Sequence, residues 1–306
     1  MKEWIRQEIT ECIATYQSNP GVCTAWKEPL IGYANAQDAL FLRLKQVVSS
    51  SHYTPGELLD RAQTVIVYFL PFDERVARSN RRDVYAAQEW AMAYIETNQL
   101  IVAINQHLAQ ALGQRGYECV VMPPTHNFHE KELLSDWSHK HIGYIAGLGK
   151  FGLHQMLITA MGSCGRLGSI VTDAYIEATP RGTEEACLYK YNQTCTACVK
   201  RCVSTALTES GFDRHKCYTV LLENAENYKG NGLADVCGKC VSLVPCSFKN
   251  PVARLLKTQA RRASRHAGTS TESRQADCLE FKTSARGPNR LGSTLDDVAA
   301  LRHRNP

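Results

Sequence analysis

Cysteine is the residue type best suited to chemistry in this 306-residue chain, which contains 13 of them. Eight lie between Cys187 and Cys246, and six of these form two closely spaced sets, Cys195-x2-Cys198-x3-Cys202 and Cys237-x2-Cys240-x5-Cys246. Two intervening residues let one tight turn bring two sulfurs to the same metal centre. In a reducing compartment such thiols are more often metal ligands or catalysts than disulfide partners. The sequence therefore predicts a metal-binding module.

Two iron–sulfur clusters would use all eight cysteines. In paired-cluster ferredoxins the run is C-x2-C-x2-C-x3-C-P, and its last cysteine ligates the other cluster. Applied here, this crossing assigns Cys195, Cys198 and Cys246 to one cluster and Cys202, Cys237 and Cys240 to the other. We expect Cys217 to complete the second cluster. We expect Cys187 to complete the first, because Asn192 occupies the ferredoxin position for that ligand.

A zinc ribbon is the competing interpretation of the same cysteines. It would use Cys195, Cys198, Cys237 and Cys240. The two halves of a ribbon are usually separated by about 15–20 residues, whereas 38 residues lie between Cys198 and Cys237. A ribbon would also leave four nearby cysteines unused. We therefore favour two four-iron clusters over zinc, and either metal over disulfides.

The elements that must position these cysteines are suggested by hydrophobic periodicity and turn residues. We expect an amphipathic helix over 1–18, a long helix over 84–112, and buried strands, which are Leu30–Ala34, Thr64–Leu70, Tyr117–Met122, Leu157–Thr159 and Ser169–Thr172. This order predicts an α/β or α+β domain over 1–180. The cysteine sets define a ferredoxin-like module over 181–248. Residues 249–306 form a basic segment that we expect to be poorly ordered.

Composition indicates a globular protein, with 44% hydrophobic and 21% charged residues. No stretch approaches the length of about 20 apolar residues that a membrane-spanning helix needs, and the first residues lack the apolar core of a signal peptide. We therefore expect a cytoplasmic protein. The net charge of +5 is concentrated in the last segment, where 12 Lys and Arg face 5 Asp and Glu, giving +7 for 249–306.

The stretch from about Ser138 to Cys246 resembles the epoxyqueuosine reductases, which are relatives of the reductive dehalogenases. Four features carry the resemblance: AGLGKFG at 146–152, GRLGSIVTDAYIE at 165–177, the two cysteine sets, and CYTVLLE at 217–223. The resemblance implies a nitroreductase-like domain that holds a cobalamin, two four-iron clusters that pass electrons to its cobalt, and an external donor of the ferredoxin or flavodoxin type.

The glycine-rich run then becomes a candidate cofactor-binding segment. Without side chains, its backbone could approach a flat macrocycle and donate N–H groups to it. The resemblance accordingly implies corrinoid contacts by Ala146, Gly147, Leu148, Gly149 and Gly152. The alternative is a tight turn between a helix and a strand.

Three departures from the family pattern indicate a shortened paralogue. The Asp-Ser-Ala-Pro context of the family's catalytic acid is absent upstream of Ala146. The first cysteine motif has Asn192 in place of Cys and Val203 in place of the usual Pro. The C-terminal helical-repeat domain that helps the tRNA-acting members hold tRNA is replaced by the basic segment.

Without that Asp, the proton donor must come from another residue. Donors near neutral pH are His side chains, or acids and Tyr residues with shifted pKa values. The candidates are Asp136, His139 and His141, with Tyr94 on the long helix and His126 and His129 in the same polar stretch. A metal site made by these histidines is disfavoured, because no pair has the i, i+4 spacing of a helical zinc motif.

The sequence thus predicts an iron–sulfur oxidoreductase that passes electrons to a bound corrinoid to reduce an unknown small-molecule or nucleoside substrate. One rival is an electron-transfer or corrinoid-reducing protein without substrate chemistry. Another is the tRNA epoxyqueuosine reductase itself, or an RNA-acting relative that uses the basic segment for phosphate contacts. RNA binding is not favoured, because this segment has a single aromatic residue, Phe281.

Overall fold

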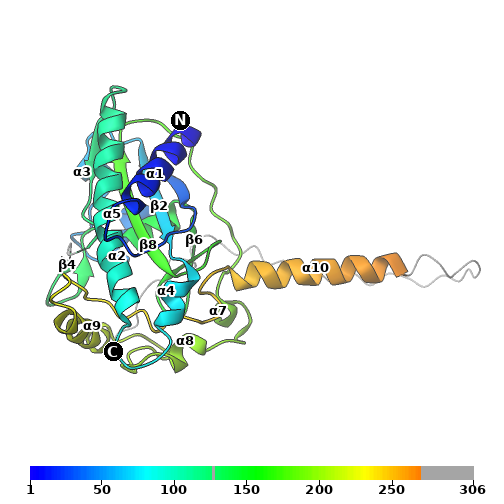
Figure 1. Cartoon of the computed structure of the whole chain (residues 1–306). Coiled ribbons are helices and arrows are strands. Elements are labelled where there is room, and N and C mark those ends of the chain that lie inside the picture. The colour runs from blue at the N-terminus through cyan, green and yellow to red at the C-terminus, as the bar shows by residue number, and fades with distance from the viewer. Residues whose placement is uncertain (126–127, 270–306) are drawn as a thin grey trace, which may run out of the picture.

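A four-stranded sheet forms the centre of the computed structural model, which describes the backbone of residues 1–125 and 128–269 and their side chains up to Ala260 (Figure 1). The strand order is β1 (Leu30–Asn35), β2 (Thr64–Pro71), β8 (Gly165–Thr172) and β3 (Cys119–Val121). Every neighbouring pair is antiparallel. Of the two predicted fold classes, the structure is therefore α+β.

Strand β2 is buried on both faces and divides the core into two layers. Ile66, Tyr68 and Leu70 face one hydrophobic cluster, while Val65 and Val67 face the other, as alternation along a strand requires. The first layer is covered by α1 (Lys2–Gln17) and α5 (Gln88–Gly113) and the second by α2 (Leu40–Val47) and α6 (His139–Ile145). Figure 1 shows α1 and α5 side by side over the sheet.

The cysteine-rich region packs against a small hairpin rather than against the central sheet alone. Leu153 and Ile158, from the hairpin segment, share a third hydrophobic cluster with Ala186, Leu207 and Val244. The remaining elements are α3 (Pro55–Leu58), α4 (Glu74–Ser79), β4 (Phe128–His129), β5 (Leu134–Ser135), β6 (Gly149–Phe151), β7 (Leu157–Thr159), α7 (Leu188–Asn192), α8 (Ala197–Lys200), α9 (Arg214–Asn227) and α10 (Pro251–Thr269). No helix in these described ranges is long and apolar enough to span a membrane.

Most of the predicted elements are present, with shifted ends. The helix expected over 84–112 begins at Gln88, because Asp83 has a left-handed φ of 63° and Ala87 is an extended N-cap. The backbone N–H of Ala87 donates a hydrogen bond to the side-chain oxygen of Asn80. Strand β8 begins at Gly165 rather than at Ser169, because its pairing with β2 continues to Pro71.

The basic segment predicted from residue 249 onward begins with helix α10, which projects from the body (Figure 1). Its start has a clear local cause: the Asn250 side chain accepts the N–H of Ala253 at 3.0 Å, and Pro251 follows the cap. Asn caps and a Pro at the first helical position both favour helix initiation. Residues 270–306 lie outside the described part of the chain.

A truncation tests which part of this segment belongs to the fold. Deleting 259–306 should leave the melting temperature within about 2 °C of the full chain, because surface changes cost little and Gln259 and Ala260 are exposed. Deleting from Pro251 onward should lower it by several degrees, because this also removes the fully buried Val252. Thermal unfolding followed by circular dichroism distinguishes the two. Equal melting temperatures for both truncations would contradict the assignment.

Candidate functional site

The structure brings together the four cysteines predicted for the first cluster. Burial, together with the charges of Cys187 and Cys195, raises the pKa of the Cys198 thiol to about 11. Burial also raises the pKa of Cys246, and the charges of Cys187 and Cys198 add to the rise. These mutual effects act between neighbouring sulfurs. We call Cys187, Cys195, Cys198 and Cys246 the first cysteine group.

The other four cysteines form a second group. Burial raises the pKa of the Cys217 thiol to about 12, with further contributions from Cys237 and Cys202. Burial raises the pKa of Cys240 as well, and Cys237, Cys217 and Cys202 increase it further. We call Cys202, Cys217, Cys237 and Cys240 the second cysteine group. The charge of Cys198 also raises the pKa of Cys240, so the two groups are adjacent.

Short local elements hold these sulfurs in place. Cys187 is the N-cap of α7, and Cys217 lies in the first turn of α9, whose N-terminus is capped by the Asp213 carboxylate. The Cys202 sulfur accepts the N–H of Leu207 at 3.4 Å. Within the described chain, no three His, Cys, Asp or Glu side chains lie close enough together to hold a single metal ion.

The side chain of Asn192, which replaces a cysteine of the ferredoxin motif, is hydrogen-bonded within its own turn. Its side-chain oxygen accepts the hydroxyl of Thr194 at 2.6 Å and the N–H of the same residue at 3.3 Å. It closes the turn after α7, where Gln193 is left-handed. The structure therefore gives Asn192 a role in the turn.

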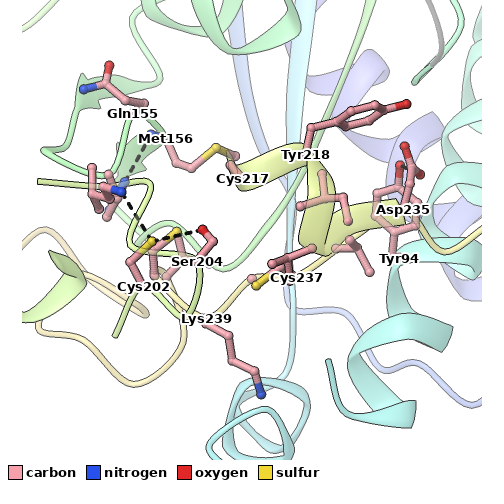
Figure 2. A pocket seen from close by; sticks show the side chains of 18 of the residues that line it. Tyr94, Gln155, Met156, Cys202, Ser204, Cys217, Tyr218, Asp235, Cys237 and Lys239 are labelled. Carbon is pink, nitrogen blue, oxygen red and sulfur yellow. Dashed lines mark hydrogen bonds between the residues drawn. The ribbon is translucent and has the colours of Figure 1, made fainter. Parts of the chain in front are cut away.

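A cavity of about 420 Å³ adjoins the second cysteine group. All four cysteines of that group line it, together with apolar side chains such as Phe72, Trp90 and Phe212. Figure 2 shows Cys202, Cys217 and Cys237 on one side of this cysteine-lined cavity and Tyr94 beside Asp235 on another. The wall also includes four cationic residues, Lys140, Arg166, Arg214 and Lys239.

Among the predicted proton donors that the structure describes, Tyr94 is the one that lines this cavity. Its hydroxyl donates to Asp235 at 2.6 Å and lies 3.3 Å from the hydroxyl of Thr125. The Arg166 guanidinium lies 4.2 Å from the centre of the Tyr94 ring. Burial raises the pKa of the Tyr94 phenol, Arg166 opposes the rise, and the Asp235 charge adds to it. The hydrogen-bonded pair places the hydroxyl proton of Tyr94 at the cavity wall.

The other predicted donors have partners elsewhere and do not line this cavity. Asp136 accepts hydrogen bonds from Ser51 and His129. His141 is bonded to the hydroxyl of Ser138 at 2.7 Å and its ring lies against Phe151. His139 contacts the Ser169 hydroxyl and the Pro123 carbonyl oxygen. His126 falls outside the described residues.

The glycine-rich run lies apart from the cysteine-lined cavity. Gly147, Leu148 and Gly149 line a second cavity of about 540 Å³, while Ala146 is fully buried. A Cβ on Gly149 would lie 2.2 Å from the carbonyl oxygen of Ile158, so this glycine is required by the close packing of β6 on β7. No residue lines both cavities. The run therefore adjoins a different cavity from the one that the second cysteine group lines.

The second cavity has a basic wall. Its cationic residues are Lys150, Arg181, Lys249, Arg254 and Lys257, and its acidic residue is Glu184. Arg181 is paired with Asp38. Lys249, Arg254 and Lys257 form no salt bridge within the described part of the chain. The wall also includes Ala186, which directly precedes Cys187 of the first cysteine group.

Sequence reasoning missed several polar residues of the cysteine-lined cavity. Asp235 lies two residues before the second cysteine set, and Arg166 lies within the GRLGSIVTDAYIE segment. The sequence could have indicated both residues, because a charged residue close to predicted ligands, or within a family-like motif, is a candidate to lie in the same site. His154, which also lines the cavity, follows the glycine-rich run.

Comparison with known proteins gives a shared fold. No protein-family model and no curated protein sequence matches the chain. Among solved structures, an epoxyqueuosine reductase bound to an epoxyqueuosine-modified tRNA-Tyr stem loop is similar, with a TM-score of 0.51, 16% identity and 80% of this chain covered. A catabolic reductive dehalogenase, NpRdhA, is similar with a TM-score of 0.50 and 16% identity, and the match covers 79% of this chain. A reductive dehalogenase whose structure suggests a mechanism for B12-dependent dehalogenation has a TM-score of 0.50 and 15% identity, and the match covers 78% of this chain.

The match covers only part of each of these proteins. The aligned region spans 66% of the epoxyqueuosine reductase chain and 33–34% of the dehalogenase chains. The predicted resemblance is thus confirmed at the level of the fold: the chain has structural neighbours among epoxyqueuosine reductases and reductive dehalogenases.

His139 gives a testable dependence of stability on pH. Burial lowers its pKa to about 4, and the charge of Arg166 lowers it further, while its bond to Pro123 opposes them. Its ordinary pKa is about 6.5, so the unfolded chain binds a proton in the window between about 6.5 and 4 while the folded chain does not. Stability is therefore lost as pH falls through this window, by about 2 kcal/mol at pH 5.

Urea denaturation at pH 7 and pH 5 checks this. In His139→Gln the loss of stability between the two pH values should be smaller than in the wild type by about 2 kcal/mol. His215→Gln is the control, since His215 is exposed at the start of α9. An unchanged difference in His139→Gln would show that the folded state tolerates a charged imidazole at this position.

Proposed function

We propose that the chain is an iron–sulfur oxidoreductase in which each cysteine group holds one four-iron cluster. The observation that carries this proposal is the division of eight cysteines into two adjacent groups of four, one of which lines a cavity. Four thiolates are the usual ligand set of a four-iron cluster. Such clusters accept and release one electron at a time. The region over 181–248 would then be the two-cluster module attached to the α+β domain.

The donor set fits such clusters in its chemistry. Thiols with raised pKa values remain protonated in a buried site unless a metal compensates the charge of the thiolates. The N–H of Leu207 that reaches the Cys202 sulfur is the type of hydrogen bond that surrounds cluster sulfurs. Both features support metal-bound thiolates.

The cysteine-lined cavity would hold the electron acceptor. The second cysteine group provides one side of its wall, and the hydrogen-bonded Tyr94 and Asp235 provide another. Reduction of most organic acceptors needs protons as well as electrons. Tyr94 would release a proton from its hydroxyl to the acceptor. Before transfer Asp235 would hold the Tyr94 hydroxyl in position. On transfer the hydroxyl would turn from Asp235 to the acceptor, and Arg166 would offset the charge of the phenolate, which the Asp235 carboxylate opposes.

An external donor must deliver electrons to the first cysteine group. The basic wall of the second cavity reaches Ala186, next to Cys187, so an acidic donor protein of the ferredoxin or flavodoxin type would be attracted there. A similar structure was solved with a tRNA stem loop, which makes RNA a second candidate for this surface. The basic wall lies beside the first cysteine group, and this position favours the electron donor over RNA, because only the donor needs to be near a redox centre.

A corrinoid is the second candidate for the cysteine-lined cavity, supported by the dehalogenase neighbour described as B12-dependent. A corrinoid is a large macrocycle, so its site should be larger than ordinary ligand cavities, and the resemblance implies that it includes the glycine-rich run. About 420 Å³ is within the ordinary range of 300–1,000 Å³, and that run lines the other cavity. The residues that line the cysteine-lined cavity therefore do not match the corrinoid site that the resemblance implies.

Iron content tests the proposal. Protein reconstituted under anaerobic conditions should contain about eight iron atoms per chain, as two four-iron clusters imply. Cys187→Ser should lose the cluster of the first group, while Asn192→Ala should retain both, because the Asn192 side chain is bonded within its own turn. Iron analysis and absorbance spectra provide the measurement. Stoichiometric zinc, or four iron atoms in the wild type, would rule out the two-cluster assignment.

Equilibrium dialysis against hydroxocobalamin tests the second candidate. We expect the protein not to retain a stoichiometric amount of corrinoid, that is, one molecule per chain, because the cavity is of ordinary size. The matched control is Leu221→Trp, which places a larger side chain in the cavity wall. Retention of one corrinoid by the wild type that is abolished in Leu221→Trp would contradict our expectation and restore the corrinoid as the acceptor.

A further inference from the structure

His154 connects the first cysteine group with the wall of the cysteine-lined cavity. The side chain is 4% exposed, and its Nε2 atom lies 3.3 Å from the sulfur of Cys246. His154 also lines the cavity, whose cysteines belong to the second group. It is therefore placed between the two groups, in direct contact with one predicted ligand.

The hydrogen bonds of the ring fix which nitrogen carries the proton. The backbone N–H of Met156 donates to Nδ1 at 3.1 Å, so Nδ1 is an acceptor and carries no hydrogen. A neutral imidazole with an unprotonated Nδ1 has its hydrogen on Nε2. The Nε2–H group therefore points to the sulfur of Cys246 and donates to it.

Gly152 provides the space that this orientation needs. A Cβ at residue 152 would lie 2.6 Å from the ring carbon Cε1 of His154 and 2.9 Å from Nε2. Any larger residue at 152 would therefore displace the imidazole. This gives the last glycine of the glycine-rich run a role of its own: it leaves room for the ring that contacts Cys246.

We propose that His154 is a positioning residue of the first cluster, which donates an N–H···S hydrogen bond to the Cys246 thiolate and so raises the reduction potential of that cluster. This inference rests on the proposed function. Adding one electron makes the cluster and its thiolates more negative. A hydrogen bond to a ligand sulfur stabilises the reduced state more than the oxidised state. The proton stays on Nε2 in both states, so the step moves one electron and no proton.

Potentiometric titration followed by electron paramagnetic resonance tests this in the reconstituted protein. His154→Phe keeps a flat ring but removes the donor, and should lower the midpoint potential of the first cluster while leaving the second unchanged. His154→Gln can present an N–H near the Nε2 position and should keep the potential closer to the wild-type value. Cys187→Ser, which damages the first cluster, identifies which signal belongs to it.

Two further variants separate this role from a structural one. Gly152→Ala should shift the same potential in the same direction, because the added Cβ displaces the ring. His141→Phe is the matched control: this histidine is also buried, but its ring bonds the Ser138 hydroxyl and lies against Phe151. It should leave both potentials unchanged.

The outcomes distinguish this inference from the proposed function. A wild-type protein without iron would end the proposed function itself. With eight iron atoms present in His154→Phe, an unchanged potential, or an equal shift of both clusters, would overturn the role of His154. If His154→Phe does not retain iron, the potentials of His154→Gln and Gly152→Ala decide the question in the same way.

Discussion

Burial of cysteine sulfur is the constraint on which the cysteine-rich region depends. Burial raises the thiol pKa values of Cys198, Cys217 and Cys240, so thiolates at these positions need a compensating cation. The helices that hold them are short: α7 has 5 residues and α8 has 4. Helices of this length are not stable alone. If this region binds the proposed clusters, we expect its folding to be coupled to them, as in small metal-dependent modules.

The features that could be predicted from the sequence are those encoded over short distances. The continuous apolar run that ends at Pro71 predicted the buried strand β2, and the cysteine spacing with its crossing predicted the two cysteine groups. The proton donor could not be selected in this way. Tyr94 and Asp235 are 141 residues apart, and their hydrogen bond exists only because α5 passes beside the loop before the second cysteine set. Asp136, His139 and His141 looked equally suitable until their partners were known.

The glycine-rich run shows why a motif does not specify its own purpose. A glycine permits close approach of any group, whether a cofactor or another strand. At Gly149 the approaching group is the carbonyl of Ile158, and at Gly152 it is the ring of His154. Sequence alone could not distinguish these cases, because the missing Cβ leaves no trace of what occupies its place. The Asn250–Pro251 pair was a signal of the opposite kind, since its capping role is local and was available from the sequence.

The two sides of the cysteine-lined cavity complement each other electrostatically. An electron that enters an apolar cavity makes its occupant negative, and low polarity increases the energetic cost of that charge. Under the proposed function, the cationic residues of the wall, Lys140, Arg166, Arg214 and Lys239, would reduce this cost, and Tyr94 would neutralise the charge by supplying a proton. The Asp235 carboxylate would oppose a negative occupant, but its hydrogen bond from Tyr94 and the nearby Arg166 limit this effect. The arrangement therefore favours acceptors that take up an electron and a proton together.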